Sequence, residues 1–435
     1  MPSKTHLLKN IGIVILGLVL IGVVAGVSVH RVSTGSSDFD TYYYAGKSIL
    51  AGEAIYTISR QAVNQSKSPF VYPPFFACLI SILSFLPISV AASIWNVLNL
   101  FFFVGSLFLM HQMLMGNQNF SAWFQKGHQV WFVLLSTLLV LILIDNLAMA
   151  QVNLFVFFLV LLALRSFREE KEIPSGIWLG IATAIKLIPA IFFFYFLIQK
   201  KWRVFAGGFI AFVLCVWLFP ALVVGHERNL NYLKSWYEET IKDHGNPHTL
   251  GFYASQLNPS HQNLQAVIFR LVIDWEFRER TGGPNGKKFE YRTPLRLNED
   301  GSTWIASAVC GILFLVLCFV LVRARSQSKT SNTFALLMSC LFCAMVLLSP
   351  KARSHFFIFI CFPWAVLLKM LITEKNVKET QVGKAIFSMS ALLYLLQGFK
   401  YFKFLGTGSF SILTLFLYFA SQFLKPMQKT APEKS

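Results

Sequence analysis

A short acidic, tyrosine-rich segment carries the first residues of this chain that could do chemistry. It runs from Ser37 to Ala45 and contains Asp38, Asp40 and three consecutive tyrosines. A carboxylate held at a membrane surface, partly removed from water, could act as a general base. The same position suits an N-cap, because an aspartate before a helix can satisfy unpaired backbone N–H groups. Asp38 and Asp40 also form a D-x-D pair, but two carboxylates alone are weak support for a metal site.

A lysine stands inside an apolar run in the middle of the chain. Lys186 lies between Gly180 and Pro189, in a stretch that otherwise has the composition of a membrane segment. An ammonium within a membrane is costly and usually faces a cavity, a partner or an anion, although a lysine side chain can also extend to the membrane surface. Because the loops on both sides are basic, we predict a broken or re-entrant hairpin around Lys186 and Pro189, which would line a cavity.

A polar stretch in the longest loop is followed by a cation. Residues 260–264 include His261, Gln262 and Asn263, and Arg270 comes six residues later. Polar side chains with a nearby cation can orient a sugar or a phosphate.

Basic residues also gather between two apolar runs near residue 350. Lys351, Arg353 and His355 lie in the short loop 349–356, which the charge pattern places outside the cell. Positive charge on that side runs against the positive-inside tendency, so it requires a local reason. A bound phosphate would supply one.

Amides occur inside several apolar runs, including Asn99, Gln151 and Asn153. In membranes such amides most often bond neighbouring helices, and this interpretation stays open beside a role in a site. The paired prolines after Tyr72 are explained by structure alone, because proline at the first position of a helix loses no hydrogen bond.

The composition indicates the solvent around these residues. Of 435 residues, 55% are hydrophobic and 13% charged, whereas about 25% are charged in ordinary globular domains. The 44 phenylalanines and 10 tryptophans suit a surface that meets lipid. A net charge of +18 could indicate nucleic acid, but Lys and Arg occur in short clusters between apolar runs. We therefore predict an integral membrane protein that does not bind nucleic acid.

The apolar runs predict an all-α membrane bundle of roughly 10 to 12 helices. The first run, residues 8–30, has the features of a retained span rather than a removed signal peptide. Basic clusters place both termini in the cytoplasm. The loops 33–70, which includes an interfacial helix, 225–303 and 349–356 are then extracytoplasmic. Because no repeat or linker divides the chain, we predict one membrane domain over residues 1–435.

The order of these motifs resembles glycosyltransferase family 87, the polyprenol-phosphate-mannose-dependent alpha-mannosyltransferases of the GT-C superfamily. The resemblance extends from Asp38 to about Trp364. It rests, in order, on Asp38, Phe39, Tyr42, Tyr43, Ala45, Gly52, Tyr56, Tyr72, Pro73, Pro74, Trp95, Asn99, Gln151, Val152, Asn153, Gly180, Ala182, Lys186, Pro189, Gln262, Leu264, Arg270, Ser349, Pro350 and His355. Each piece is common alone, but the succession is specific.

The resemblance implies a GT-C-type bundle that acts as an inverting glycosyltransferase in the cell membrane. An acceptor hydroxyl, on a lipid-linked or glycan acceptor, would attack the anomeric carbon of a polyprenyl-phosphate sugar outside the cell. Mannose is the expected sugar. Because a phosphate leaving group needs no strong acid, one carboxylate suffices, unlike the pair in hydrolytic glycosidases. The resemblance implies no metal and no other cofactor.

The resemblance also implies roles for individual residues. Asp38 matches the acid of the family's Asp-Phe-x-x-Tyr-Tyr pattern and would be the general base, with Asp40 as the alternative. The donor phosphate would be bound by Lys186, Arg353, His355 and Arg270. The substrates would be contacted by Tyr42, Tyr43, Tyr72, Gln151, Asn153, Gln262 and Asn263.

Several positions depart from the family pattern. Ala150 replaces the glycine that is usual before Gln-Val-Asn. His261 and Asn263 stand where Asn and Ser are usual, and Arg353 and Phe356 stand where Trp and a second His are common. These departures leave the family assignment intact but leave the identities of donor and acceptor open.

Two other functions fit parts of the same pattern. Broken helices and intramembrane charge also build transporters, which would predict inverted repeats that the sequence does not show. A ligase that moves a whole oligosaccharide from a lipid carrier would also place an acid after the first span. The sequence separates this ligase poorly from a monosaccharide transferase, and it leaves the oligomeric state open.

Overall fold

The computed structural model describes residues 37–56, 69–116, 126–242, 256–273, 295–325, 330–373 and 377–424, with a few residues between 22 and 31. These residues are nearly all helical, and their only strand-like feature is an isolated bridge between Ile273 and Leu297. The all-α prediction is confirmed. Most of the predicted first span, 8–30, and parts of the predicted loops 33–70 and 225–303 lie outside the described residues.

Four helical stretches in the described ranges are long and apolar enough to cross a membrane. They are α5 (Ile88–Met115), Trp202–Val224, α17 (Glu299–Ala324) and Ser354–Thr373. At 1.5 Å per residue, the 28 residues of α5 extend about 42 Å, beyond the ~30 Å hydrocarbon core of a bilayer. The chain is an integral membrane protein. The count of roughly 10 to 12 crossings stays a prediction.

The helices group into two compact units, each assembled from three segments of the chain. The first unit comprises Met1–Leu109, Val140–Leu187 and Arg203–Ile241, and the second comprises Met110–Leu139, Ile188–Trp202 and Lys242–Ser435. The single domain over residues 1–435 stays a prediction.

In the first unit, α2 (Phe39–Ala51) packs against α4 (Pro74–Ser81). Pro74 opens α4 at a position where its missing N–H costs nothing. Gly46 permits the close approach, because a Cβ there would lie 3.0 Å from the Ser81 backbone. The predicted short helix after the first span therefore exists, but most of its residues are buried by protein, so it is less amphipathic than expected.

The helix α12 (His226–Trp236) bonds to residues just after α2 and just before α4. The Tyr232 hydroxyl donates to the Glu53 carbonyl at 2.6 Å. The Trp236 indole N–H donates to the Val71 carbonyl at 3.1 Å. The start of the predicted loop layer is thus an ordered helix that supports the segment following α2.

The span Trp202–Val224 changes its helical form in the middle. It consists of α10 (Trp202–Val213), the π-helical turn η3 (Leu214–Leu218) and α11 (Phe219–Val224). Pro220 has no N–H to donate to Val216 and its ring crowds that carbonyl, so the π turn accommodates it. Asn229, fully buried on α12, donates to the carbonyls of Val216 and, at 2.9 Å, Trp217. Its amide therefore satisfies carbonyls at the distorted turn.

Replacing Asn229 with alanine is expected to destabilise the protein by about 1–3 kcal/mol, because buried carbonyls lose their donor. Thermal unfolding of the purified protein in detergent would measure the effect. Asn332→Ala is the matched control, since Asn332 is an exposed amide at the start of another helix, and it should change stability by less than about 0.5 kcal/mol. Equal losses for both variants would contradict the prediction.

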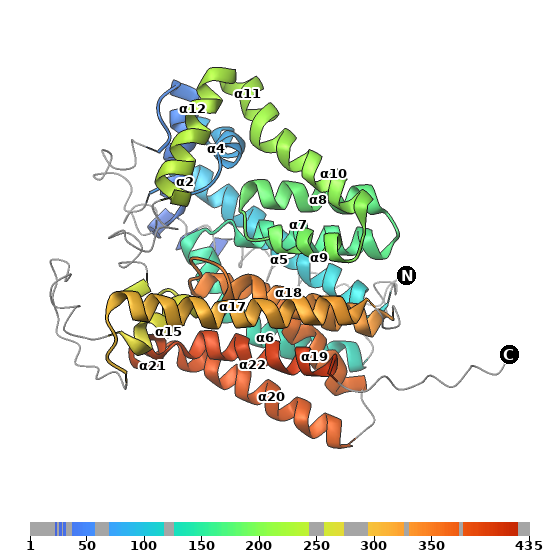
Figure 1. The fold of residues 1–435 in the computed structure, drawn as a ribbon. Helices are drawn as coiled ribbons and strands as arrows, with labels where there is room; N and C mark the ends of the chain where they lie inside the picture. The colour runs from blue at the N-terminus through green and yellow to red at the C-terminus, as the bar shows by residue number, and fades with distance from the viewer. Residues whose placement is uncertain are drawn as a thin grey trace, which may run out of the picture. The chain divides into compact units, whose positions relative to one another are not determined.

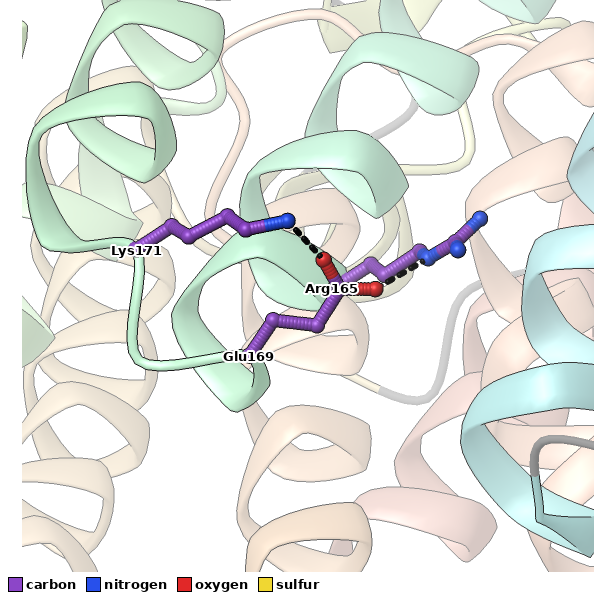
Figure 2. A network of polar contacts seen from close by, with 3 residues as sticks. All are labelled: Arg165, Glu169 and Lys171. Atoms are coloured by element: carbon purple, nitrogen blue, oxygen red, sulfur yellow. Dashed lines mark hydrogen bonds and ion pairs between the residues drawn. The ribbon is translucent and has the colours of Figure 1, made fainter.

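Ion pairs lie at the turn between α7 (Asn153–Arg168) and α8 (Glu172–Ile185), which pack side by side. Glu169 accepts from Arg165 Nε and from Lys171 Nζ, both at 2.8 Å (Figure 2). The hydrogen bond from Lys171 has the largest effect in lowering the pKa of Glu169, and that from Arg165 the next largest. Exposed ion pairs contribute only about 0–1 kcal/mol to stability, so these pairs add little to the stability of the turn.

Glycines let α8 approach α10 closely. A Cβ at Gly176 would lie 2.7 Å from the Gly208 backbone N, and a Cβ at Gly180 would lie 2.8 Å from the Ala211 Cβ. Small residues four apart are a common way for membrane helices to pack, because they bring backbones into contact. This packing explains the glycine at position 180.

The predicted break around Lys186 is confirmed. The helix α8 ends at Ile185, Lys186 has an extended backbone (φ −149°, ψ 126°), and α9 (Ala190–Ile198) begins after Pro189. With 14 and 9 residues, neither helix reaches the roughly 20 residues needed to cross a bilayer alone. That the run turns back to the side from which it came stays a prediction.

The second unit contains a bundle of long helices. Its helices include α15 (Leu264–Val272), α17, α18 (Ser331–Leu347), α19 (Cys361–Thr373), α20 (Val377–Leu396), α21 (Lys400–Leu405) and α22 (Thr407–Gln422). Figure 1 shows α17, α18, α20 and α22 side by side. Polar bonds join three of these helices: Trp364 Nε1 donates to Ser390 Oγ at 3.0 Å, and Ser390 lies 3.0 Å from Ser411 Oγ. Such bonds hold membrane helices together without charge.

Candidate functional site

Asp38 stands directly before α2, but its side chain does not cap that helix. Ser37 Oγ takes this part instead, by accepting from the Phe39 N–H at 3.1 Å. The half-buried Asp38 carboxylate accepts a hydrogen bond from Gln151 Nε2. Capping therefore does not account for the acid at position 38.

Asp40, the alternative base, lies in the first turn of α2 and is 3% exposed. Successive residues of a helix are about 100° apart, so Asp38 and Asp40 do not share a face. An acid in a first helical turn also stabilises the helix dipole. Asp40 thus has a structural explanation as an acid in the first turn of a helix.

A chain of hydrogen bonds leads away from the Asp38 carboxylate. Gln151 Oε1 accepts from the Tyr42 hydroxyl at 3.2 Å, and the Tyr42 and Tyr72 hydroxyls lie 3.0 Å apart. Gln151 and Tyr42 are each 1% exposed. Burial, followed by the charges of Tyr72 and Asp38, raises the pKa of Tyr42 well above its usual value. Tyr42 therefore stays protonated and donates to Gln151, and the role of Asp38 as general base stays a prediction.

The Lys186 ammonium is held within the same unit by two contacts. Its Nζ donates to Asn153 Oδ1 at 2.6 Å. It also lies 5.7 Å from the centre of the Tyr72 ring, which is a cation–π distance. The side chain thus reaches protein groups in its own unit, which supports a site residue over one that extends to the membrane surface.

Tyr43 makes different contacts from Tyr42. Its hydroxyl donates to the Leu86 carbonyl at 2.7 Å, and Lys47 Nζ lies 5.2 Å from the centre of its ring. The ring is 4% exposed. These contacts explain Tyr43 as a tie between α2 and the segment after η1 (Leu83–Phe85), and its predicted contact with substrate stays a prediction.

A tight backbone turn positions Gln151. The helix α6 (Lys126–Met149) ends with Ala150 at φ +48°. The Gln151 N–H bonds to the Asn146 carbonyl at 2.9 Å, and the Ala150 N–H bonds to the Leu147 carbonyl at 3.1 Å. This is a Schellman motif, whose left-handed position favours glycine. The departure from the family glycine at Ala150 therefore falls where a side chain costs backbone strain.

Replacing Ala150 with glycine is expected to stabilise the protein by about 0.5–1 kcal/mol. Relief of the left-handed strain, roughly 1–2 kcal/mol, exceeds the added entropy of the unfolded chain. Glu170→Gly and Lys200→Gly, at φ +59° and +55°, should change stability in the same direction. Thermal unfolding in detergent measures this, with Ala91→Gly inside α5 as a control that should lose about 1 kcal/mol. A destabilised Ala150→Gly would contradict the assignment of strain.

The carbonyls of the same turn accept hydrogen bonds from Asp38 and from Trp95. The Asp38 N–H donates to the Met149 carbonyl at 3.1 Å, and the Trp95 indole N–H donates to the Ala150 carbonyl at 2.9 Å. The predicted amides at the end of α6 are thus part of a scaffold for Asp38. Trp95, singled out in the sequence only by resemblance, supports this turn from α5.

Arg270, predicted to bind the donor phosphate, is fully buried in the second unit. Its guanidinium donates to the carbonyls of Gln256 and Asn258 at 3.0 Å each, His261 at 2.9 Å and Phe404 at 3.4 Å. A guanidinium has five N–H donors, so these bonds use most of them. They explain Arg270 as the residue that shapes the loop before α15.

Gln262 and Asn263 lie at the start of α15, and both are fully buried. Gln262 Nε2 donates to the carbonyls of Pro259 and Lys403, each at 2.8 Å. Its backbone N–H donates to the Ala352 carbonyl. The Gln262 backbone thus ties this loop to the segment before Arg353, and its side-chain amide ties the loop to Lys403. The predicted contact of Gln262 with substrate stays a prediction.

Arg353 and His355 lie near that loop. The exposed Arg353 places Nε 3.4 Å from Nε2 of His261, while His355 is buried with its ring 5.3 Å from the Phe356 ring. The link to His261 was not expected from the sequence, where His261 stood out as part of the polar stretch 260–264 and as a departure from the family pattern. Lys186 belongs to the other unit, so the predicted convergence of these cations on one phosphate stays a prediction.

Comparison with known sequences decides the family. The profile of Glycosyltransferase family 87 matches residues 70–350, which is more than half of the chain. This chain belongs to glycosyltransferase family 87. The resemblance drawn from its motifs is confirmed.

The chain is also similar to a curated mannosyltransferase. The polyprenol-phosphate-mannose-dependent alpha-(1-2)-phosphatidylinositol mannoside mannosyltransferase of Mycobacterium tuberculosis is 23% identical over 373 residues, 82% of this chain and 75% of the relative. No solved structure matches the chain. Gln151, Asn153 and Lys186 lie within the residues that the family profile matches, whereas Asp38 and His355 lie outside them.

Proposed function

We propose that this family 87 transferase moves one mannose from a polyprenyl-phosphate donor to a lipid-linked or glycan acceptor. The name of the mycobacterial relative supports the donor. The observation that carries the proposal is a single group of side chains that links a carboxylate to an ammonium. Asp38 is joined to Tyr72 through Gln151 and Tyr42, and Lys186 lies over the Tyr72 ring.

These groups divide the work of an inverting transfer. The acceptor hydroxyl gives its proton to Asp38 as its oxygen bonds to the anomeric carbon. The bond from that carbon to the phosphate oxygen breaks, and the phosphate leaves with the electron pair. Lys186 stabilises the negative charge that grows on the phosphate. We propose that no metal takes part, and that Arg353 and His355 also bind the donor phosphate.

The proposed site faces outward from the cell membrane, with both termini in the cytoplasm. The basic turns around Arg165 and Lys200 support this orientation, because such clusters remain inside. Reporter fusions at Glu53 and at Glu170 would test it, with an extracytoplasmic signal expected only from Glu53. A cytoplasmic signal at Glu53 would overturn the proposed sidedness.

A transfer assay tests the reaction itself. Membranes containing the protein are incubated with radiolabelled polyprenyl-phosphate-mannose and a lipid extract, and we expect one labelled mannose on a lipid or glycan product. Membranes without the protein are the control. Label that crosses the membrane without forming a glycosidic bond would favour a transporter. Transfer only of a preassembled oligosaccharide from a lipid carrier would favour a ligase.

A further inference from the structure

The turn between α6 and α7 presents two buried amides toward two different charged groups. Gln151 Nε2 bonds to the Asp38 carboxylate, and Asn153 Oδ1 accepts from Lys186 at 2.6 Å. The two amides are 1% and 0% exposed. One turn of three residues therefore contacts both charges of the proposed reaction.

The backbone of this turn is constrained on both sides. The Gln151 N–H closes the end of α6 by bonding to Asn146, and Asn153 is the first residue of α7. Val152 begins α7 by accepting from the Val156 N–H at 3.1 Å. Because two helices meet here, the distance between the two amides is set by rigid elements.

The direction of the Gln151 amide follows from chemistry. An ionised carboxylate only accepts hydrogen bonds, so the NH₂ group of Gln151 must face Asp38 and its carbonyl oxygen must face Tyr42. Tyr42 then donates to Gln151 and accepts from the Tyr72 hydroxyl. The bonded chain thus orients each partner, and cooperative bonds in a buried site hold this arrangement.

We propose that the Gln151-Val152-Asn153 turn positions the two charged groups of the transferase, an inference that rests on the proposed function. Gln151 holds the Asp38 carboxylate toward the acceptor hydroxyl. Asn153 holds the Lys186 ammonium toward the donor phosphate. Both are positioning residues, which act through their charged partners rather than by touching the sugar.

Positioning matters because a misplacement of about 1 Å can reduce a rate about 10²-fold. Loss of the Gln151 donor would let the carboxylate leave the path of the acceptor proton and would lower kcat. Loss of the Asn153 acceptor would release the ammonium from the place where it stabilises the charge growing on the phosphate, and would lower kcat/KM for the donor. Variants two residues apart should therefore act through different charged partners.

The first arm of the test compares two changes at Gln151. Gln151→Glu keeps the shape of the side chain and still accepts from Tyr42, but it presents an acceptor to Asp38. Gln151→Met removes both polar atoms. If Gln151 positions the carboxylate, Gln151→Glu lowers kcat at least as much as Gln151→Met, by about 10–100-fold. A residue that only fills space would make the isosteric glutamate the milder change.

The second arm pairs Asn153 with Lys186. Asn153→Leu alone should lower kcat/KM for polyprenyl-phosphate-mannose about tenfold, because the ammonium that it leaves unpositioned stabilises the transition state. Combined with Lys186→Met, it should cause no further loss of kcat/KM, because the cation it positions is already gone. Size-exclusion chromatography and thermal unfolding in detergent show whether each variant is folded.

The outcomes separate the inference from the function on which it rests. If the wild-type protein transfers no mannose, the proposed function is wrong and the inference falls with it. If it transfers mannose but Gln151→Glu is the milder variant, or the Asn153 and Lys186 losses multiply, the inference alone is wrong.

Discussion

Asp38→Asn is expected to reduce mannose transfer by about 10²–10⁴-fold, the usual contribution of a general base. Asparagine keeps the size of the side chain and an oxygen that can accept from Gln151, the partner of Asp38. The variant should therefore fold, accumulate in the membrane and bind donor. Initial rates with radiolabelled donor, divided by the amount of protein in the membrane, measure the effect.

Asp40→Asn is the matched control for that experiment. Asp40 lies two residues further along, in the first turn of α2 and buried. Its loss should remove a favourable charge from the helix start, worth about 0.3–1 kcal/mol of stability, and leave transfer largely intact. An inactive Asp40→Asn together with an active Asp38→Asn would mean that Asp40, not Asp38, is the general base.

Lys186→Met is expected to lower kcat/KM by about 10²–10³-fold, because a cation aimed at the leaving phosphate stabilises charge that grows in the transition state. Methionine keeps an apolar, unbranched side chain against the Tyr72 ring. The loss should persist at high salt, because this half-buried charge is screened less than a surface charge. Steady-state kinetics at varied donor concentration measure it.

Lys47→Met separates the charge of Lys186 from its contact with a ring. Lys47 also lies over a tyrosine, 5.2 Å from the centre of the Tyr43 ring, but it is exposed on α2 and has no proposed part in the reaction. Its replacement should leave kcat/KM within about threefold of wild type. Comparable losses in the two variants would contradict a role in the reaction that is specific to Lys186.

The break near Lys186 and the helix after residue 38 could be predicted from the sequence, because both depend on local properties. Pro189 cannot continue a preceding helix, and an apolar run interrupted by a lysine has few stable conformations in a membrane. The helix α2 begins at Phe39 as the acidic start suggested. Its burial could not be predicted, because it depends on Gly46 meeting α4, a partner that the local sequence does not identify.

The contacts of individual site residues could be found only in the tertiary structure. A sequence pattern places an arginine at position 270 but not the four carbonyls that surround its guanidinium. It shows an alanine at 150 in place of glycine, but not the left-handed backbone there.

By itself, the sequence determined that this chain is a membrane-embedded member of a glycosyltransferase family, since hydropathy and motif order are properties of the chain read in one direction. Only the tertiary structure decided which groups act on which. Gln151 meets Asp38 across 113 residues of sequence, and Lys186 meets Asn153 across 33. Hydrogen bonds are short and directional. Their partners are therefore chosen by how the helices pack, and an amide that suits several roles in the sequence has one in the folded protein.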